Sequence, residues 1–445
     1  MLVVKKIYII IKIMKITHLG ASTIIVEHKK KRILFDPWLD DGIVYGAWYR
    51  WPPAKIKPQQ VGKLDYIIIS HIHEDHCSAG TLKHLDKNAE VIIMDRKPNF
   101  VKKFLDYNKF NFKNVHLIKP YEIKNIFSDL FVSFVEADEE NFFSYLIDSG
   151  IVLKTNDKVL YNSNDCLPTD KAINFIKKNF KKVDLALLPY TGVSGYPNCY
   201  LNLSHEKKIK EAKRISIERM ELLKQTAYKL KPKMIMPFAD QFVIGGKNSY
   251  LNKYSPHPPS IKNVSDYFKK DKSLNFLLLN VMQSYDLIKG KKNPNTSFKN
   301  YTNSERNRFI KKISKEKYDS DKITLNEAIS EERLLEYACQ RFFNEQKKQK
   351  YKTNWKILFN IKDKDKNKKY LINLKNSKLE KLNGSFKNIN KNNSITMHIN
   401  KDVFIFLLLG HMSWNMADGA LFILYDRIPN KFDPKLYAFI NYLKV

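Results

Sequence analysis

The sequence predicts an α/β (α+β) protein in which an αββα sandwich is followed by a smaller α+β domain. Short apolar runs typical of buried strands alternate with turns from residue 13 to about residue 240. A long amphipathic segment between Ser204 and Pro232 predicts a helix that separates two of these strands. The 445 residues leave room for a second unit after a proline-rich stretch.

The first predicted domain covers residues 1–260. Segments such as 66–69 and 91–94 are apolar without alternation, as in strands that are covered on both faces. The other strands that we expect are a hairpin over 24–35, a meander over 131–135, 143–147, 151–153 and 159–161, and short strands over 185–188 and 234–236. Two β meanders with intervening helices suit two packed sheets with helices on the outside.

The remaining chain divides at a stretch that is rich in Pro, Asn, Ser and Lys. We expect residues 261–304 to be a linker region around one apolar strand, and residues 305–445 to form the C-terminal α+β domain. The elements expected in that domain are helices over 325–346 and 404–409 and strands over 355–361, 370–374, 396–399 and 420–424.

The net charge of +32 has two interpretations. It could attract anionic partners such as nucleotide phosphates, RNA or membranes, or it could be a solvated lysine-rich surface. The lysines are spread along the whole chain, which favours the solvated surface. No run approaches the ~20 apolar residues of a membrane span, and the apolar stretch near the start is too short for a signal peptide. We therefore expect a cytoplasmic protein.

The segment His71-Ile72-His73-Glu74-Asp75-His76 directly follows a predicted buried strand. His71 and His73 are two residues apart, so both side chains project from the same side of an extended backbone. Asp75 and His76 lie past the bend and can face a second metal about 3.5–4 Å from the first. Imidazole and carboxylate ligands suit iron, zinc or manganese. This segment predicts a site for one or two divalent metal ions.

This motif resembles the metal-binding loop of the metallo-β-lactamase superfamily. The resemblance implies that Asp165, which follows another predicted strand, bridges two metals. Two further superfamily ligands are usually histidines, and neither is evident in this sequence. For the one in the meander we favour Asp138 among the acidic residues between 136 and 140. For the last one, Asp240, His205 and His257 remain alternatives. We interpret the other histidines as structural, with a supporting role beside the site as an alternative for His18.

Several segments in a fixed order narrow the resemblance. They are Ile16-Thr17-His18, residues 32–39 (RILFDPWL), residues 69–76, Asn164-Asp165-Cys166, Ser194-Gly195-Tyr196-Pro197 and Met236-Pro237-Phe238-Ala239. Together they resemble the metallo-β-lactamase-like part of the CMP-N-acetylneuraminate hydroxylase (monooxygenase) family. That resemblance implies metal roles for His71, His73, Asp75, His76 and Asp165. It also implies a substrate loop that contains Tyr190, Ser194 and Tyr196.

The sequence departs from that family in one respect. A Rieske cluster needs Cys-x-His and Cys-x-x-His ligand pairs. None of the four cysteines has a histidine two or three residues after it. We therefore expect no Rieske cluster in this chain, and an oxygenase reaction would need a separate electron-transfer protein.

Three functions follow from these observations. The favoured one is an iron-dependent hydroxylase of an N-acyl sugar or sugar nucleotide that uses a separate electron donor. The second is a metal-dependent hydrolase of a phosphoester, ester or amide, and in both of these Asp75 is the expected catalytic residue. The third is a nucleic-acid enzyme or binder, which the absence of stacking platforms and of clustered arginine disfavours. The C-terminal domain resembles sterol-carrier-like domains around Ile395 to Ala420, although a purely supporting core is the simpler interpretation.

Overall fold

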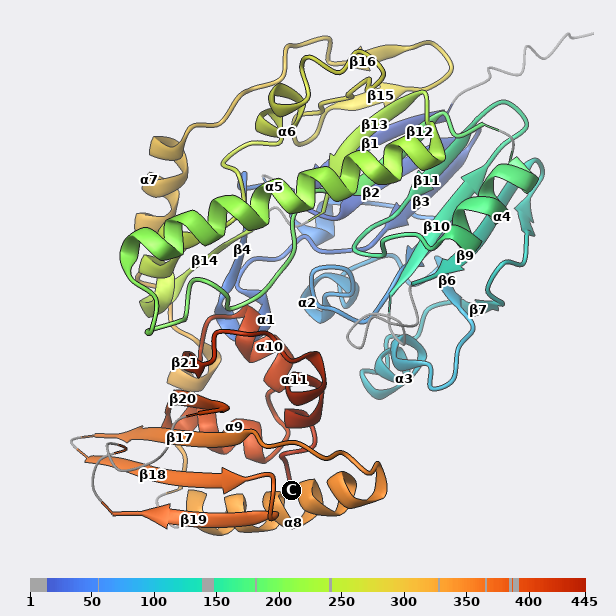
Figure 1. Cartoon of the computed structure of the whole chain (residues 1–445). Helices are drawn as coiled ribbons and strands as arrows, with labels where there is room; N and C mark the ends of the chain where they lie inside the picture. Colours follow the sequence, from blue (N-terminus) through green and yellow to red (C-terminus); the bar gives the residue numbers. More distant parts are fainter. Residues whose placement is uncertain are drawn as a thin grey trace, which may run out of the picture.

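The computed structural model describes residues 14–54, 56–137, 148–180, 182–239, 242–326, 329–364, 366–383, 386 and 392–445. Its first domain is built on two packed sheets with helices outside them, which confirms the predicted αββα sandwich (Figure 1). The last third of the chain forms a separate sheet with its own helices, the orange and red part of Figure 1.

The larger sheet of the sandwich has eight strands in the order β16-β15-β1-β2-β3-β5-β6-β7. Strands β1, β2 and β3 form an antiparallel meander, and β3, β5, β6 and β7 run parallel. Their bounds are β1 Met14–Gly20, β2 Thr23–His28, β3 Lys31–Phe35, β5 Tyr66–Ile69, β6 Glu90–Met94, β7 Asn114–Ile118, β15 Ser284–Asp286 and β16 Lys291–Asn293.

The smaller sheet has six strands in the order β13-β12-β11-β10-β9-β8. Their bounds are β8 Lys124–Phe127, β9 Leu130–Glu136, β10 Ser149–Lys154, β11 Val159–Asn162, β12 Leu185–Pro189 and β13 Met234–Phe238. The strand expected over 143–147 lies outside the described residues.

Apolar side chains of both sheets meet in the centre of the sandwich, among them Ile68, Ile92, Val132 and Leu160, which are fully buried. Helices α2 (Ala79–Leu82) and α3 (Phe100–Tyr107) lie on the larger sheet. The outer face of the smaller sheet is covered by α4 (Asp170–Phe180), α5 (His205–Leu230) and α6 (Lys262–Tyr267). The predicted helix is α5: Ser204 caps it, and it ends at Lys231 in the left-handed region, directly before Pro232.

Residues 261–304, which were predicted to be a linker region, contain segments that pair with strands of the first domain. Strand β15 pairs with β1 across Ile16 and Tyr285, and Ile235 forms a bridge with Phe276. Short strands such as these carry too little apolar periodicity to be recognised in a proline-rich segment. The division of the chain at residues 260 and 305 remains a proposal.

The C-terminal part has a five-stranded sheet in the order β19-β18-β17-β20-β21. The strands are β17 Lys356–Asp363, β18 Lys366–Asn373, β19 Lys378–Leu382, β20 Ser394–Asn400 and β21 Leu424–Ile428. The helices of this part of the chain are α7 Asn303–Ile313, α8 Glu331–Lys348, α9 Lys401–Leu408, α10 Trp414–Gly419 and α11 Pro434–Ile440. The strand expected over 420–424 begins at Leu424, because Ala420 and Leu421 donate backbone hydrogen bonds that close the end of α10.

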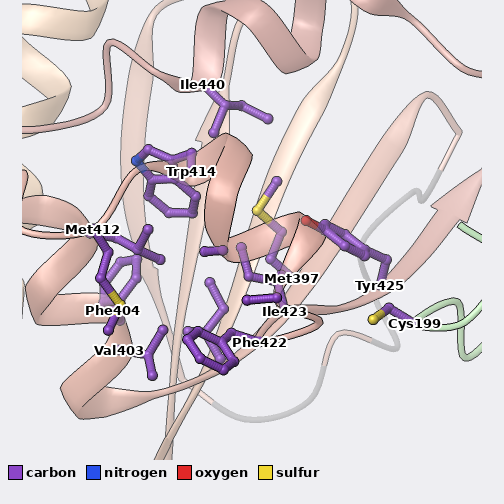
Figure 2. Close-up of a cluster of buried hydrophobic side chains, with 14 of the residues drawn as sticks. Cys199, Met397, Val403, Phe404, Met412, Trp414, Phe422, Ile423, Tyr425 and Ile440 are labelled. Carbon is purple, nitrogen blue, oxygen red and sulfur yellow. The ribbon is translucent and has the colours of Figure 1, made fainter. Parts of the chain in front are cut away.

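The interior of this domain reaches the first domain. Figure 2 shows Phe404, Trp414 and Met397 in the buried apolar cluster, with Cys199 of the first domain beside Tyr425. Backbone hydrogen bonds join Cys199 O to Tyr425 N over 2.8 Å and Leu201 N to Tyr425 O over 2.7 Å. A two-stranded sheet of β4 (Trp48–Arg50) and β14 (Phe242–Ile244), together with α1 (Ile43–Gly46), lies near the same junction (Figure 1).

Within the part of the chain that the structure describes, helices long and apolar enough to span a membrane are absent.

Candidate metal centre

The predicted metal-binding loop leaves the larger sheet at the end of β5, where Ile69 gives way to Ser70. Its histidines converge: Nε2 of His71 lies 2.9 Å from Nδ1 of His73. Two ligand nitrogens that share one metal at about 2.0–2.1 Å each must be about 3 Å apart when they are neighbours in the coordination sphere. The spacing of His71 and His73 therefore suits a shared metal ion.

Two carboxylates from the smaller sheet face this loop. Asp148 precedes β10, and its Oδ1 lies 3.6 Å from His71 Nε2. Asp165 follows β11, and its Oδ2 lies 3.4 Å from Nε2 of His76 and 3.8 Å from Nε2 of His71. Ligand atoms of His71, His73 and Asp148 lie within 4.8 Å of one another, as do those of His71, His76 and Asp165.

Asp75 extends the second of these groups. Its Oδ2 lies 3.3 Å from Nε2 of His76, and the side chain is buried. Ser22 donates a hydrogen bond to the backbone carbonyl of Asp75, which ties the loop to the turn between β1 and β2.

Hydrogen bonds behind the histidines set which ring nitrogen carries the proton. Nδ1 of His76 lies 2.9 Å from Oδ2 of the buried Asp36, so this nitrogen donates and Nε2 is left to face the site. Ser70 Oγ donates to Asp36 Oδ2 over 2.9 Å and can therefore accept from His71 Nδ1, which is also 2.9 Å away. Both histidines thus use Nδ1 for these supporting contacts and turn Nε2 toward the site.

Three buried atoms at this point lack a hydrogen-bond partner among the described residues: Nε2 of His76, Oδ1 of Asp148 and Oδ1 of Asp165. Buried polar atoms are normally paired, and unpaired ligand atoms that face one another are suited to bind a metal ion. The residues present therefore fit one or two divalent metal ions.

The electrostatics of the protein without metal agree with this interpretation. Burial lowers the pKa of His71 well below its ordinary value, and neighbouring His76 lowers it further. Burial raises the pKa of the Asp148 carboxyl well above its ordinary value, and the nearby Asp165 adds to the rise. Two buried carboxylates repel each other unless a cation lies between them.

The site forms one wall of a cleft of about 1200 Å³ between the two parts of the chain. The metal-site residues His73, Asp75, Asp148 and Asp165 line it, with Ser194 and Tyr196 of the predicted substrate loop. The opposite wall includes Asp418 and Arg427 of the C-terminal domain, and the exposed face of α5 contributes basic residues.

Not every predicted site residue lies in this cleft. Tyr190 is buried and lines a smaller, separate cavity together with His18 and His257. His257 is bound to the backbone there, with Nε2 3.3 Å from Gly192 O. His205 contacts Tyr254 at the start of α5, with 3.2 Å between Nδ1 and the hydroxyl. Asp138 and Asp240 lie outside the described residues.

Two residues of the site were missed by the sequence analysis. Asp148 directly follows the predicted strand over 143–147, and that position at a strand end was the available signal. Asp36 stood in the quoted segment 32–39 without an assigned role. Its function depends on a contact between β3 and the loop after β5, which a sequence pattern does not reveal.

Comparison with known proteins agrees with the fold and the site. Residues 31–220 match the family described as the Beta-lactamase superfamily domain. The part of the chain that carries the candidate metal-site residues therefore matches a domain of the β-lactamase superfamily.

The relatives include proteins named for oxidative chemistry and a protein named as a hydrolase. A protein of Mycolicibacterium smegmatis named as a Rieske 2Fe-2S iron-sulfur protein is 26% identical over 42% of this chain and 36% of its own length. The cytidine monophosphate-N-acetylneuraminic acid hydroxylase of Danio rerio is 25% identical over 51% of this chain and 38% of its own length. A UPF0173 metal-dependent hydrolase of Bacillus subtilis is 29% identical over 40% of this chain and 73% of its own length.

The chain thus spans well under half the length of the first two relatives. Among solved structures, the diiron β-hydroxylase CmlA from Streptomyces venezuelae aligns with a TM-score of 0.40 and 13% identity, over 62% of this chain and 53% of that chain.

Proposed function

We propose that this protein is an iron-dependent hydroxylase of an N-acyl sugar or sugar nucleotide that takes its electrons from a separate donor. The observation that carries the proposal is the composition of the ligand set. Asp148, Asp165 and Asp75 join three histidines, and such an oxygen-rich set favours iron or manganese over zinc. The similarity to CMP-N-acetylneuraminic acid hydroxylases supports the same chemistry.

The residues that would hold the metal form two groups that share His71. His73 and Asp148 belong to one group, and His76 and Asp165 belong to the other. The iron supplies the redox chemistry with dioxygen when it is bound. Hydroxylation inserts one oxygen atom of dioxygen into a C–H bond and reduces the other to water, which consumes two electrons and two protons. No cysteine of this chain has the histidine spacing of a Rieske ligand pair, so the donor is proposed to be separate.

Side chains of this chain would position the substrate and move protons. Ser194 and Tyr196 line the cleft and can hydrogen-bond to a sugar. Asp75 also lines the cleft and lies beside His76, so its Oδ2 can hold a proton during the reaction. We assign Asp75 both a metal-binding and a catalytic role.

The charge of the cleft supports an anionic substrate. The basic residues that line it are Lys207, Lys210, Arg214 and Arg219 of α5 and Arg427 of the C-terminal domain. Arg214 is neutralised by Glu211 and Glu218, with N···O distances of 2.7 and 2.6 Å, but none of these carboxylates pairs with Lys207 or Lys210 within the described residues. The ammonium groups of Lys207 and Lys210 could therefore bind a phosphate of a sugar nucleotide, although acidic residues such as Asp418 also line the cleft.

The test is turnover of a CMP-linked N-acyl sugar by the iron-loaded protein with a chemical reductant and isotopically labelled dioxygen. The proposal predicts a product that carries one labelled oxygen atom, and no such product without reductant. Its absence from iron-loaded protein across CMP-linked and free N-acyl sugars would contradict the proposal.

Hydrolysis is the second candidate, because the relative from Bacillus subtilis, which is 29% identical over 40% of this chain, is named a metal-dependent hydrolase. In that case Oδ2 of Asp75 would accept the proton of the attacking water. Turnover of a phosphoester, ester or amide without oxygen and without reductant would favour this function over hydroxylation.

A further inference from the structure

A small cavity lies behind the loop that follows β12, separate from the metal centre. Its lining includes His18 from β1, Tyr190 and His257 from two loops, and Arg306 from α7. The volume of the cavity is about 20 Å³. One water molecule occupies about 10–15 Å³, so the cavity can hold more than one water-sized group, and an anion that enters it must be small.

Arg306 is a buried cation without a counter-ion. Its side chain is 6% exposed, and only Nη1 has a partner, the backbone carbonyl of His257 at 3.4 Å. Nε and Nη2 are buried without a hydrogen bond, and no carboxylate among the described residues forms an ion pair with this guanidinium. Burial lowers the pKa of Arg306 to about 10, so the group stays charged at neutral pH. A buried charge of this kind normally has an anionic partner.

His18 lines the same cavity and offers the opposite kind of atom. It is 2% exposed, and its Nδ1 lies 3.3 Å from the carbonyl oxygen of Leu279, which can only accept. Nδ1 therefore carries the proton, and the buried Nε2 is an acceptor that has no partner among the described residues. Burial lowers the pKa of His18 to about 4, which keeps the ring neutral.

The cavity thus offers positively charged donors from Arg306 and one acceptor without a partner, Nε2 of His18, to a ligand. We propose that this cavity binds a small oxyanion that carries a hydroxyl group, of the inorganic phosphate class. Its charged oxygens accept hydrogen bonds from Nε and Nη2 of Arg306, and its hydroxyl donates to Nε2 of His18. The site is independent of the proposed hydroxylase function.

Occupation of the cavity also bears on the cleft. The imidazole of His257 donates from Nε2 to the carbonyl of Gly192, and Gly192 lines the large cleft. Arg306 contacts the backbone carbonyl of His257, so an anion that fixes Arg306 also helps to hold His257 in place. The oxyanion would therefore steady the loop between Pro189 and Tyr196.

The test is the midpoint of thermal unfolding as inorganic phosphate replaces chloride at constant ionic strength. Wild-type protein should gain several degrees, because a ligand that binds only the folded state stabilises it. Arg306→Gln should gain nothing. Arg308→Gln removes an exposed arginine from the same helix and should respond like wild type. Arg306→Lys keeps a charge and should retain part of the gain, which provides a second variant if Arg306→Gln does not fold.

Phosphate could also bind at the metal centre. The His71→Ala, His73→Ala variant separates the two sites, because its gain from phosphate should equal that of wild type. Sulfate has no hydroxyl at neutral pH, so it should raise the unfolding midpoint of wild type less than phosphate does. CMP is too large for the cavity, so any rise that it causes should be the same in wild type and in Arg306→Gln. An equal gain in wild type and Arg306→Gln, or no gain in wild type, would overturn the proposal. A crystal structure in phosphate that shows one water beside Arg306 would do the same.

Discussion

Nε2 of His71 lies 3.6 Å from Oδ1 of Asp148, although the two residues come from different sheets of the sandwich. His71 follows the central strand β5, and Asp148 stands at the start of β10. The candidate metal centre therefore depends on how the two sheets pack, as well as on the histidine-rich loop. This dependence makes Asp148 the most informative residue for testing the ligand set.

Replacing Asp148 by Asn should weaken metal binding strongly, because the amide keeps the shape of the side chain but loses the charge. The loss of affinity should exceed the ~10–100-fold that is typical of residues behind the ligands. Metal titration of the apoprotein measures it. Asp106→Asn removes an exposed carboxylate of α3 and should bind like wild type. Equal affinities of Asp148→Asn and wild type would remove Asp148 from the ligand set.

Asp36→Asn should reduce metal affinity by about 10–100-fold without removing a ligand. The reason is that Asp36 accepts from His76 Nδ1 and from the backbone and side chain of Ser70, and thereby orients both histidines. The same titration gives the affinity, and thermal unfolding of the apoprotein gives the stability. A large loss of apoprotein stability with unchanged affinity would mean that Asp36 only holds the loop.

A short hydrogen bond from Gly195 helps to hold the loop before Pro197 on the C-terminal domain. Gly195 N donates to Asp418 Oδ2 over 2.9 Å, and a Cβ at Gly195 would overlap with Oδ1 of the same carboxylate. Gly195→Ala should therefore destabilise the protein by roughly 1–3 kcal/mol and raise the KM of any cleft substrate. Chemical denaturation and kinetics measure the two effects.

A double-mutant comparison controls this prediction. In an Asp418→Ala background the overlap is gone, so Gly195→Ala should cost much less. The same cost in both backgrounds would show that the loop is strained by its own backbone and not by the C-terminal domain.

His18 should make stability depend on pH. Its folded pKa is about 4, below the ordinary 6.5, so between these values the unfolded chain binds a proton that the folded chain does not. The free energy of unfolding should therefore be highest above pH 6.5 and should fall by roughly 3 kcal/mol as the pH drops to about 4. Denaturation of wild type and His18→Gln across this range in phosphate-free buffer measures it. Parallel pH profiles for the two proteins would contradict the prediction.

The site residues that could be predicted from the sequence are those that lie close together along the chain. His71, His73, Asp75 and His76 lie in one short loop after an apolar strand, so their proximity follows from the chain itself. The strand pattern and α5 likewise predict the sandwich. Asp148 and Asp36 could not be assigned, because their distances to the histidines depend on the packing and pairing of strands that are far apart in sequence.

The contact between the first domain and the C-terminal domain also could not be predicted from the sequence. Cys199 and Leu201 pair with Tyr425 through backbone atoms, and such pairing leaves no mark in residue type. Tyr190 was expected beside the cleft because it lies in the loop with Ser194 and Tyr196. It is buried in the smaller cavity instead, since a loop can turn its successive side chains to different sides.

The most direct test of the central claim is elemental analysis of the protein purified without added metal, beside the His71→Ala, His73→Ala variant. A His84→Ala, His116→Ala variant, which removes two exposed histidines of the same domain, is the matched control. The account predicts iron in wild type and control and none in the first variant, with the variant still folded. Equal metal content in all three proteins would contradict the assigned metal centre, and zinc in place of iron would favour hydrolysis.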